Sequence, residues 1–273
     1  MCYYNGQKVT RAEYIRLKNL EKLVANYDFL THDLDIGFNY QPIAVLKPQP
    51  GKEDFDIVKM EWGFIPDANR WPFIETRVQL DQYRKGFVDQ RGKFTQLTML
   101  NAVCEELLLP NKIYRDAALN RRCLILSSGF YEWRHIYRLN KRTGQPLKTP
   151  DKYPYHIKVK DREYFFMAGV WQSWTDADTG EYVESCAIVT TAANVLMEQV
   201  HNSKKRMPTI LDEDLAYEWM FGKLDENRIL EIAANQFPAD KMEAYTIEKG
   251  FINSLNPVEP HSYLELPPLV TSS

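Results

Sequence analysis

The stretch Arg121–Trp133, RRCLILSSGFYEW, decides the fold. It is short, apolar and aromatic, which is typical of β-strands, and Gly129 within it indicates a bulge or a close backbone approach. Segments of the same kind, bounded by Pro, Gly or Asp, lie at residues 40–48, 56–65, 153–160, 163–174 and 184–192. Because strands and helices do not alternate regularly, the sequence predicts one α+β domain with a mainly antiparallel sheet.

Helices are expected beside these strands. Thr10–Glu13 has the pattern of a capping box, and apolar residues follow at helical spacing from Tyr14 to Val24, which predicts a first helix. Five more helices are predicted at residues 77–83, 111–119, 193–200, 213–220 and 227–234. The expected domain spans residues 1–257 with a polar hairpin insertion at 138–151, and a Pro-rich tail occupies 258–273.

The composition is that of an ordinary globular protein. Of 273 residues, 44% are apolar and 26% are charged. The longest apolar run, Phe165–Trp171, is far shorter than the roughly 18 residues of a membrane span, and the N-terminus has no apolar signal-peptide region. We therefore expect a soluble, cytoplasmic monomer without membrane contact. The four cysteines form no C-x-x-C pair, so neither a metal site nor a disulfide is expected, and Cys123 and Cys186 are predicted to be buried.

Charge is distributed unevenly along the chain, although the formal net charge is only −3. Residues 101–160 hold 12 Lys and Arg against 5 Asp and Glu, whereas residues 209–273 hold 4 against 12. A basic middle part favours a face that binds a polyanion. The alternative is a solvated basic hairpin over residues 134–152.

Cys2 directly follows the initiator methionine, so removal of Met1 leaves an N-terminal cysteine. Such a residue carries an amine and a thiol on adjacent carbons, and its amine, with a pKa near 7.7–8.0, is partly neutral at physiological pH. It can condense with an aldehyde to an imine, which the thiol then closes to a thiazolidine. The alternative is a coincidental or buried cysteine, because reactivity depends on the surroundings.

Three other polar residues are candidates for proton transfer. Glu132 stands in an aromatic strand, where apolar walls raise a carboxyl pKa. His201 precedes a Lys-Lys-Arg run and is a possible general acid or base. Asn101 is a weaker candidate. Taken singly, Glu132 is more simply explained as an exposed strand carboxylate and His201 as a histidine at a helix C-terminus.

Together these motifs resemble the SOS response-associated peptidase (SRAP) family of abasic-site processing proteins. The matching blocks run in family order from residue 2 to about residue 257. They are Met1-Cys2, Phe38–Pro42, Trp62–Pro66, Asn101-Ala102 with Glu105, Tyr114–Ala117, Arg121–Leu124, Gly129–Trp133, Ala168–Trp171, Thr190–Asn194, His201 and Arg206–Pro208. So many blocks in the right order override the separate alternatives for each residue.

The resemblance implies a single domain with a β-barrel-like core and flanking helices, and covalent capture of abasic sites in single-stranded DNA without a metal or cofactor. By this resemblance Cys2 forms the thiazolidine, after Met1 is removed by self-cleavage or by an aminopeptidase. Glu132 relays protons and Asn101 orients the Cys2 amine or the sugar. His201 assists Schiff-base formation and ring opening.

The resemblance also implies a set of DNA contacts. The residues concerned are Asn39, Pro42, Trp62, Arg115, Arg122, Trp133 and Arg206. Three departures from the family pattern stand beside them: Tyr3-Tyr4 replaces Gly-Arg, Val103 replaces an arginine, and Lys204-Lys205 lengthens the segment between His201 and Arg206. Tyr3 or Tyr4 is a candidate for stacking on a base in place of the lost charge.

Two other functions fit the same residues. A cysteine peptidase that cleaves other proteins uses Cys2 as a nucleophile activated by His201 or Glu132. It needs no free amine, so N-terminal acetylation distinguishes it from thiazolidine chemistry. A binding module that reads single-stranded or modified DNA without chemistry tolerates the loss of Cys2.

Overall fold

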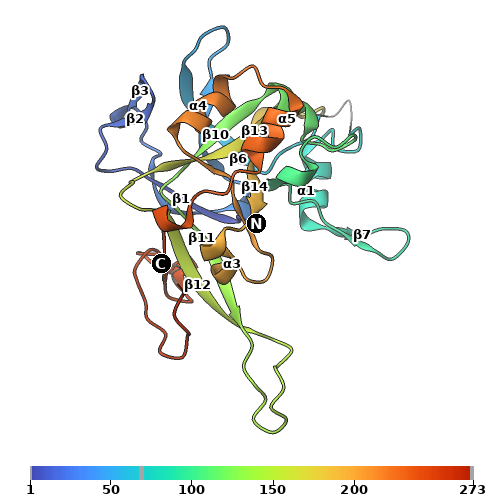
Figure 1. The fold of residues 1–273 in the computed structure, drawn as a ribbon. Helices are drawn as coiled ribbons and strands as arrows, with labels where there is room; N and C mark the ends of the chain where they lie inside the picture. The colour runs from blue at the N-terminus through green and yellow to red at the C-terminus, as the bar shows by residue number, and fades with distance from the viewer. Residues whose placement is uncertain (1, 68–70, 271–273) are drawn as a thin grey trace.

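The structure is a computed structural model that describes residues 2–67 and 71–270. Two β-sheets form its centre (Figure 1). The first sheet has five strands in the order β17-β12-β11-β1-β4, and all its pairings are antiparallel. Its strands are β1 (Tyr4–Lys8), β4 (Thr31–Ile36), β11 (Gly129–Ile136), β12 (Asp151–Val159) and β17 (Met242–Thr246).

The second sheet closes on itself. Its strands β6, β5, β10, β13 and β14 pair in that order, and β14 pairs again with β6, in parallel, to complete a ring. The ring strands are β5 (Pro42–Pro48), β6 (Phe55–Trp62), β10 (Arg122–Ser127), β13 (Phe165–Thr175) and β14 (Tyr182–Ala192). Three short strands extend this sheet: β9 (Asn101–Val103), β15 (Arg206–Pro208) and β16 (Ile210–Leu211). The predicted mainly antiparallel, barrel-like core is thus confirmed, as are the six predicted strand segments.

Helices flank the two sheets. They are α1 (Arg77–Lys85), α2 (Arg115–Asn120), α3 (Val195–Val200), α4 (Glu213–Phe221) and α5 (Glu226–Ala233), with 3₁₀ turns at Val24–Asn26, Gly37–Asn39, Cys104–Glu106, Ala239–Lys241 and Phe251–Asn253. The helices predicted at 77–83, 193–200, 213–220 and 227–234 are confirmed, whereas the one predicted at 111–119 begins only at Arg115. None of the described helices is long and apolar enough to cross a membrane.

The helix predicted after Thr10–Glu13 is wrong. Strands β2 (Tyr14–Leu17) and β3 (Leu20–Leu23) form a hairpin there. The backbone N–H groups of residues 10–12 donate to the Glu163 carboxylate at 2.6–2.8 Å, so they are already satisfied by a distant side chain. Lys18 adopts φ 54°, which turns the chain back, and the resulting strand buries every second residue. Tertiary contacts therefore override the helical spacing.

Alternate residues of the ring strands enter two apolar clusters. Val45 belongs to a cluster shared with Phe130 and Ile157 of the first sheet, whereas Leu46 belongs to a cluster shared with Trp219 of α4. Cys123 and Cys186 lie in the first of these clusters with no exposed surface, as predicted. This alternation places a second apolar layer between the ring and the first sheet, where Cys2 also lies.

The C-terminal segment packs on the first sheet and on α3. Ile247 pairs with Pro260, and the Tyr263 hydroxyl donates to the Ile247 carbonyl at 2.9 Å. Further along, the backbone of Val270 exchanges two hydrogen bonds with the side-chain amide of Gln199 in α3. The tail is therefore fastened along the described part of its length.

Gly129 meets a close approach from the neighbouring strand. A Cβ atom at this position would lie 2.1 Å from Nε2 of His156 in β12. His156 is buried and its ring packs against Tyr131 and Tyr245 at centroid distances of 4.9 and 5.3 Å. The ring cannot move aside freely, so the absence of a side chain at Gly129 lets β11 and β12 pair closely.

Substituting Gly129 with alanine is expected to lower the free energy of unfolding by about 1–3 kcal/mol, the usual cost of overpacking. The same substitution in a His156→Ala background should cost less, because the clashing ring is gone. Gly250→Ala is the matched control, since a Cβ there meets nothing within 4 Å. Chemical denaturation measures all four variants, and equal costs for Gly129→Ala in both backgrounds would contradict the steric explanation.

Candidate active site

The backbone of Cys2 is held by the side chain of Asn101. The Cys2 backbone N–H donates to Oδ1 of Asn101 at 3.1 Å, and Nδ2 of Asn101 donates to the Cys2 carbonyl at 2.9 Å. Asn101 begins β9, and its own carbonyl accepts a hydrogen bond from the Tyr114 hydroxyl at 3.2 Å. The amide of Asn101 thus fixes both polar groups of the Cys2 backbone.

The thiol of Cys2 is enclosed. The residue is fully buried, and its Sγ donates weakly to the Tyr4 carbonyl at 3.6 Å. Burial, and next the nearby carboxylate of Glu132, raise the pKa of the Cys2 thiol well above its usual range. The thiol is therefore protonated at neutral pH, and any reaction of its sulfur needs a base.

Glu132 supplies a carboxyl group on the same side of β11. Its side chain is only 4% exposed, and burial raises its pKa to about 7. Successive residues of a strand face opposite sides, so Phe130 and Glu132 face the layer that holds Cys2. Tyr131 and Trp133 face the other side, where both contact Phe251. At neutral pH, Glu132 is therefore poised to gain or lose a proton.

His201 lies against Glu132. It follows α3, whose first turn is capped by Asn194, and its Nε2 is 3.6 Å from Oε2 of Glu132. Its Nδ1 is 2.8 Å from the Arg206 carbonyl. A carbonyl only accepts, so Nδ1 carries the hydrogen and the neutral ring turns the Nε2 lone pair toward Glu132. Burial lowers the pKa of His201 to about 4, which keeps the ring neutral at pH 7.

The longer segment between His201 and Arg206 is folded into a tight turn. The Lys205 N–H donates to the His201 carbonyl at 2.8 Å, and Lys205 adopts φ 51°. The side chain of Asn202 both accepts from and donates to the backbone of His135 in β11, at 2.9 and 2.8 Å. This pair of hydrogen bonds holds His201 beside Glu132 despite Lys204-Lys205. The sequence analysis missed Asn202, because nothing in its local pattern marks such a contact.

Three arginines predicted to contact DNA are engaged within the protein. Arg115 binds Glu226 and the Leu108 carbonyl. The Arg206 guanidinium binds Glu105 and the Thr190 carbonyl, each at 2.6 Å. Arg122 donates to four backbone carbonyls, those of Ala118, Leu119, Trp219 and Gly222. A phosphate role does not fit Arg122, because its donors close the ends of α2 and α4.

The other residues predicted to contact DNA differ in how much of their surface is exposed. Trp62 is 1% exposed and its indole N–H donates to the Leu100 carbonyl at 3.0 Å, so the stacking prediction for Trp62 does not fit its buried position. Trp133 is half-buried against Tyr4 and Phe251, and stacking there stays a prediction.

Asn39 and Pro42 are exposed on the segment that leads into β5. Next to Asn39, the ring of Phe38 packs against Tyr3 at 4.8 Å between centroids. Tyr3 follows Cys2 directly, so this exposed segment borders the residue that carries the amine and the thiol. DNA contacts by Asn39 and Pro42 also stay predictions.

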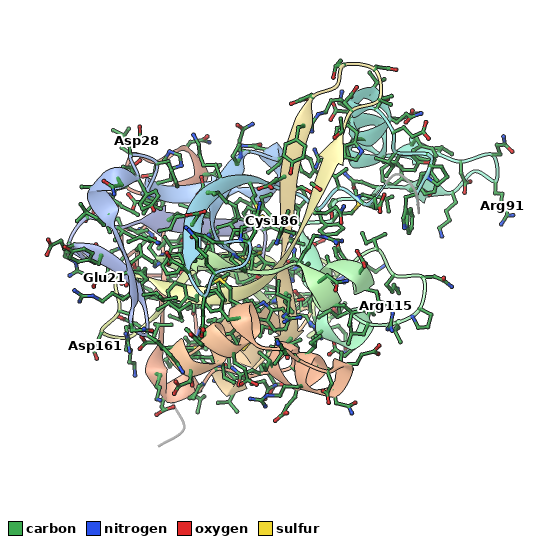
Figure 2. All side chains as sticks on the ribbon, turned by 90° about the horizontal axis from the view of Figure 1, so that it is seen from above. Glu21, Asp28, Arg91, Arg115, Asp161 and Cys186 are labelled. Carbon is green, nitrogen blue, oxygen red and sulfur yellow. The ribbon has the colours of Figure 1, made fainter. Side chains whose placement is uncertain are left out.

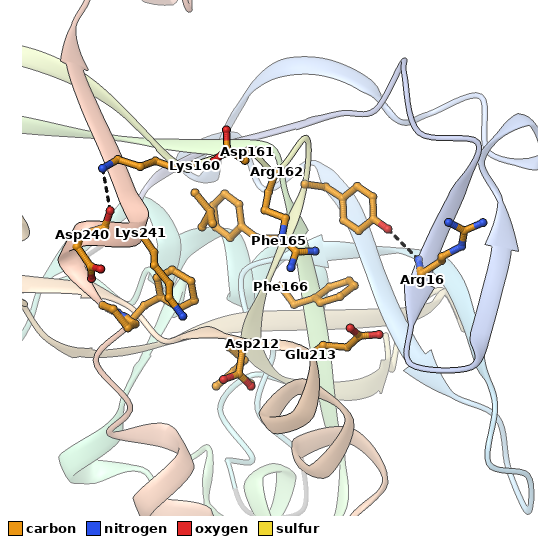
Figure 3. Close-up of a pocket in the computed structure, with 15 residues that line it drawn as sticks. Arg16, Lys160, Asp161, Arg162, Phe165, Phe166, Asp212, Glu213, Asp240 and Lys241 are labelled. Atoms are coloured by element: carbon orange, nitrogen blue, oxygen red, sulfur yellow. Dashed lines mark hydrogen bonds between the residues drawn. The ribbon is translucent and has the colours of Figure 1, made fainter.

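A cavity of about 570 Å³ lies elsewhere, between the β12–β13 turn and the start of α4. Figure 3 shows Phe165 and Phe166 on its wall and a mixed rim that includes Lys160, Asp212 and Lys241. It contains none of Cys2, Asn101, Glu132 and His201, the four residues predicted to act together. Among the described residues, no group of three or more His, Cys, Asp or Glu side chains is arranged to hold a metal ion.

Comparison with known proteins identifies relatives along most of the chain. The model of the SOS response associated peptidase (SRAP) family matches residues 6–254, a range that includes Asn101, Glu132 and His201. Abasic site processing protein YobE of Bacillus subtilis (strain 168) is 32% identical over 203 residues, which cover 74% of this chain and 75% of YobE. YoqW of the same organism, also an abasic site processing protein, is 33% identical over 64% of this chain and 72% of its own.

More distant relatives extend the match. Abasic site processing protein YedK of Escherichia coli (strain K12) is 23% identical over 94% of this chain and 96% of its own. A crystal structure of a protein from Bacteroides thetaiotaomicron superposes with a TM-score of 0.67 at 23% identity, over 96% of this chain and all of the other. The latter likeness establishes the fold.

Replacing Glu132 with glutamine is expected to stabilise the protein above pH 7. The raised pKa of Glu132 means that the folded state keeps a proton that the unfolded chain releases above its ordinary pKa of 4.5. The stability linked to that proton is present below pH 4.5 and is lost as pH rises to about 7. The unfolding free energy of Glu132→Gln relative to wild type should therefore grow across this window by up to about 3 kcal/mol.

Chemical denaturation at a series of pH values measures this difference. Glu105→Gln is the matched control, because the hydrogen bond from Arg206 lowers the pKa of Glu105 to about 2. Its difference from wild type should have the opposite sign and should develop between about pH 2 and 4.5. A pH-independent difference for Glu132→Gln would show that Glu132 titrates normally.

Proposed function

This chain belongs to the SOS response-associated peptidase (SRAP) family, and from that premise we propose that it captures abasic sites in single-stranded DNA through a covalent thiazolidine formed by Cys2. Such a linkage protects the abasic strand from breakage during the DNA damage response. The proposal is supported by the two hydrogen bonds that hold the Cys2 backbone to Asn101, and by the buried carboxyl of Glu132, which lies against His201 and raises the pKa of the Cys2 thiol after burial itself.

The N-terminal position of Cys2 decides the chemistry. Met1 lies outside the described residues, and the proposal requires its removal, so that the nitrogen held by Asn101 becomes an amine. That amine adds to C1′ of the ring-opened abasic sugar, an aldehyde. Loss of water gives an imine, and addition of the sulfur to the imine carbon closes the ring while the thiol proton passes to the nitrogen. One aldehyde and one aminothiol thus yield one thiazolidine and one water.

Glu132 is the proposed proton carrier for these steps. With a pKa of about 7, it is present in both protonation states at neutral pH, as a general acid–base catalyst requires. Its carboxylate can accept the thiol proton, which the raised pKa of Cys2 makes necessary. Its protonated form can assist the departure of water from the carbinolamine.

His201 is proposed to hold and exchange this proton. Its neutral Nε2 faces Glu132, so a protonated Glu132 has an acceptor beside it and a charged Glu132 has a partner that can be protonated. Asn101 has a positioning role, because its two hydrogen bonds set the direction of the Cys2 nitrogen. The same residues are candidates for releasing Met1, which would explain the peptidase name of the family.

The DNA strand is proposed to approach past the exposed segment of Asn39 and Pro42. Phe38 is 43% exposed there, and its contact with Tyr3 links this surface to Cys2. Exposed aromatic rings next to a polar segment are suited to stacking on unpaired bases.

The test is crosslinking of protein whose N-terminus has been checked by mass spectrometry to a single-stranded oligonucleotide with one abasic site. On a denaturing gel, wild type is expected to give a shifted band that needs both the abasic site and Cys2. Cys104→Ala, which removes another buried thiol, is the matched control and should crosslink normally. No band from protein that lacks Met1 would refute the proposal and favour a binding module.

Cys2→Ser separates the imine from the thiazolidine. The serine variant keeps the amine but replaces sulfur with a weaker nucleophile, so its imine should survive the gel only after reduction with borohydride. Wild type should survive without reductant. N-terminal acetylation should abolish crosslinking by wild type, and an acetylated protein that instead cleaves peptides would indicate a cysteine peptidase.

A further inference from the structure

A basic hairpin extends the strand that carries Glu132. It spans residues 137–150, between the end of β11 at Ile136 and the start of β12 at Asp151, and Figure 1 shows it projecting beyond the body of the molecule. Leu139 and Pro146 pair across it. At its tip, Oδ1 of Asn140 accepts hydrogen bonds from the N–H groups of residues 142 and 143. The hairpin is therefore a formed arm that lies outside the packed core.

The charges of this arm are not balanced within the protein. Lys141, Arg142 and Lys148 are exposed. In the described part of the chain, no carboxylate lies within the 4.0 Å of an ion pair from any of them. Arg138, at the base, is paired with Asp151 at 2.5 Å. Three unpaired cations on a thin ribbon repel one another, and this repulsion is relieved when a polyanion binds.

The arm is joined to the candidate active site in two ways. Glu132 lies four residues before the end of β11, so the arm continues the same strand. At its base, His135 is hydrogen-bonded through Asn202 to the turn that holds His201. Lys204 is exposed on that turn, three residues after His201. Basic groups thus extend from the site into the arm.

We propose that this arm is a second DNA-binding element, which holds the phosphodiester backbone of the flanking nucleotides away from the reacting sugar. The 14 residues between β11 and β12 give about seven residues per side. At about 3.3 Å per residue, the arm reaches roughly 20 Å beyond the sheet. Lys141, Arg142 and Lys148 act as phosphate contacts, and Tyr137, which is 52% exposed, offers a ring beside them. The inference deepens the proposed function and rests on it for the identity of the polyanion.

A variant in which Lys141, Arg142 and Lys148 are all replaced by glutamine tests the arm. Binding is measured by fluorescence anisotropy over a range of salt concentrations, with single-stranded oligonucleotides of about 8 and about 30 nucleotides. For the long strand, affinity should fall at least tenfold at about 0.1 M salt. The slope of log K against log salt should decrease in size by about 2, since each single-strand phosphate contact contributes about 0.7. Binding of the short strand should not change.

The matched control removes three charges from other loops: Lys52, Arg91 and Lys93, each replaced by glutamine. Figure 2 shows Arg91 at the outer end of the β7–β8 hairpin (β7 Phe87–Val88, β8 Phe94–Thr95), on the periphery of the molecule. An equal loss in this control would mean that only net charge matters, and would overturn the proposal. An unchanged slope in the arm variant would overturn it as well.

Two further measurements separate the possible outcomes. A long probe whose flank is duplex shows whether the arm holds paired or unpaired DNA, and loss of affinity for either supports the arm. Crosslinking of the short abasic strand at saturating concentration should equal that of wild type. If wild type binds the long strand through the arm but never crosslinks, the thiazolidine proposal fails while the arm stands.

Discussion

The burial of Glu132 is the constraint on which the arrangement of this site depends. A carboxyl group removed from water must either be neutral or have polar partners, and its raised pKa of about 7 reflects that cost. The neighbours of Glu132 come from segments that are distant in the sequence: His201 follows α3, and β1, which Cys2 precedes, pairs directly with β11. The fold therefore keeps the Glu132 carboxyl partly protonated at neutral pH. On the protein surface the same group would be fully ionised and less suited to proton transfer.

Strand β11 makes this burial possible because its two faces pack against different groups. Phe130 and Glu132 face the layer shared with the ring, while Tyr131 stacks on Phe251 on the opposite face at 5.0 Å between centroids. Gly129 lets His156 close the start of the same strand. Apolar packing on one face thus holds the position of a polar group on the other, so the geometry of the candidate site is a property of the whole sheet.

Periodicity in the sequence predicts the sheet well, because alternate residues of the ring strands are buried in the two apolar clusters on opposite faces of the sheet. It fails at Tyr14–Leu17, because the backbone N–H groups of the preceding residues 10–12 are satisfied by the distant Glu163 and the local spacing of apolar residues is misleading. The DNA contacts expected of Arg122 and Trp62 came from the family resemblance, and a sequence motif does not report whether a residue's hydrogen-bond donors turn inward or outward. The contact of Asn202 with His135 could not be predicted from the sequence either, because the two residues become neighbours only after β11 and α3 pack together.

Because these arginines turn inward, fewer of the predicted cations are available to contact DNA phosphates. Arg122 closes two helix ends and Arg206 is paired with Glu105, so neither contributes a free charge, and positions 4 and 103 hold a tyrosine and a valine. The reaction proposed for this chain, at a single sugar, requires that the DNA strand remain in place while the condensation proceeds. Phosphate contacts supply most of that affinity. In the described structure, exposed cations without an ion pair include Lys204 on the His201 turn and Lys141, Arg142 and Lys148 on the hairpin, so the extension of β11 can supply the charge that the arginines do not.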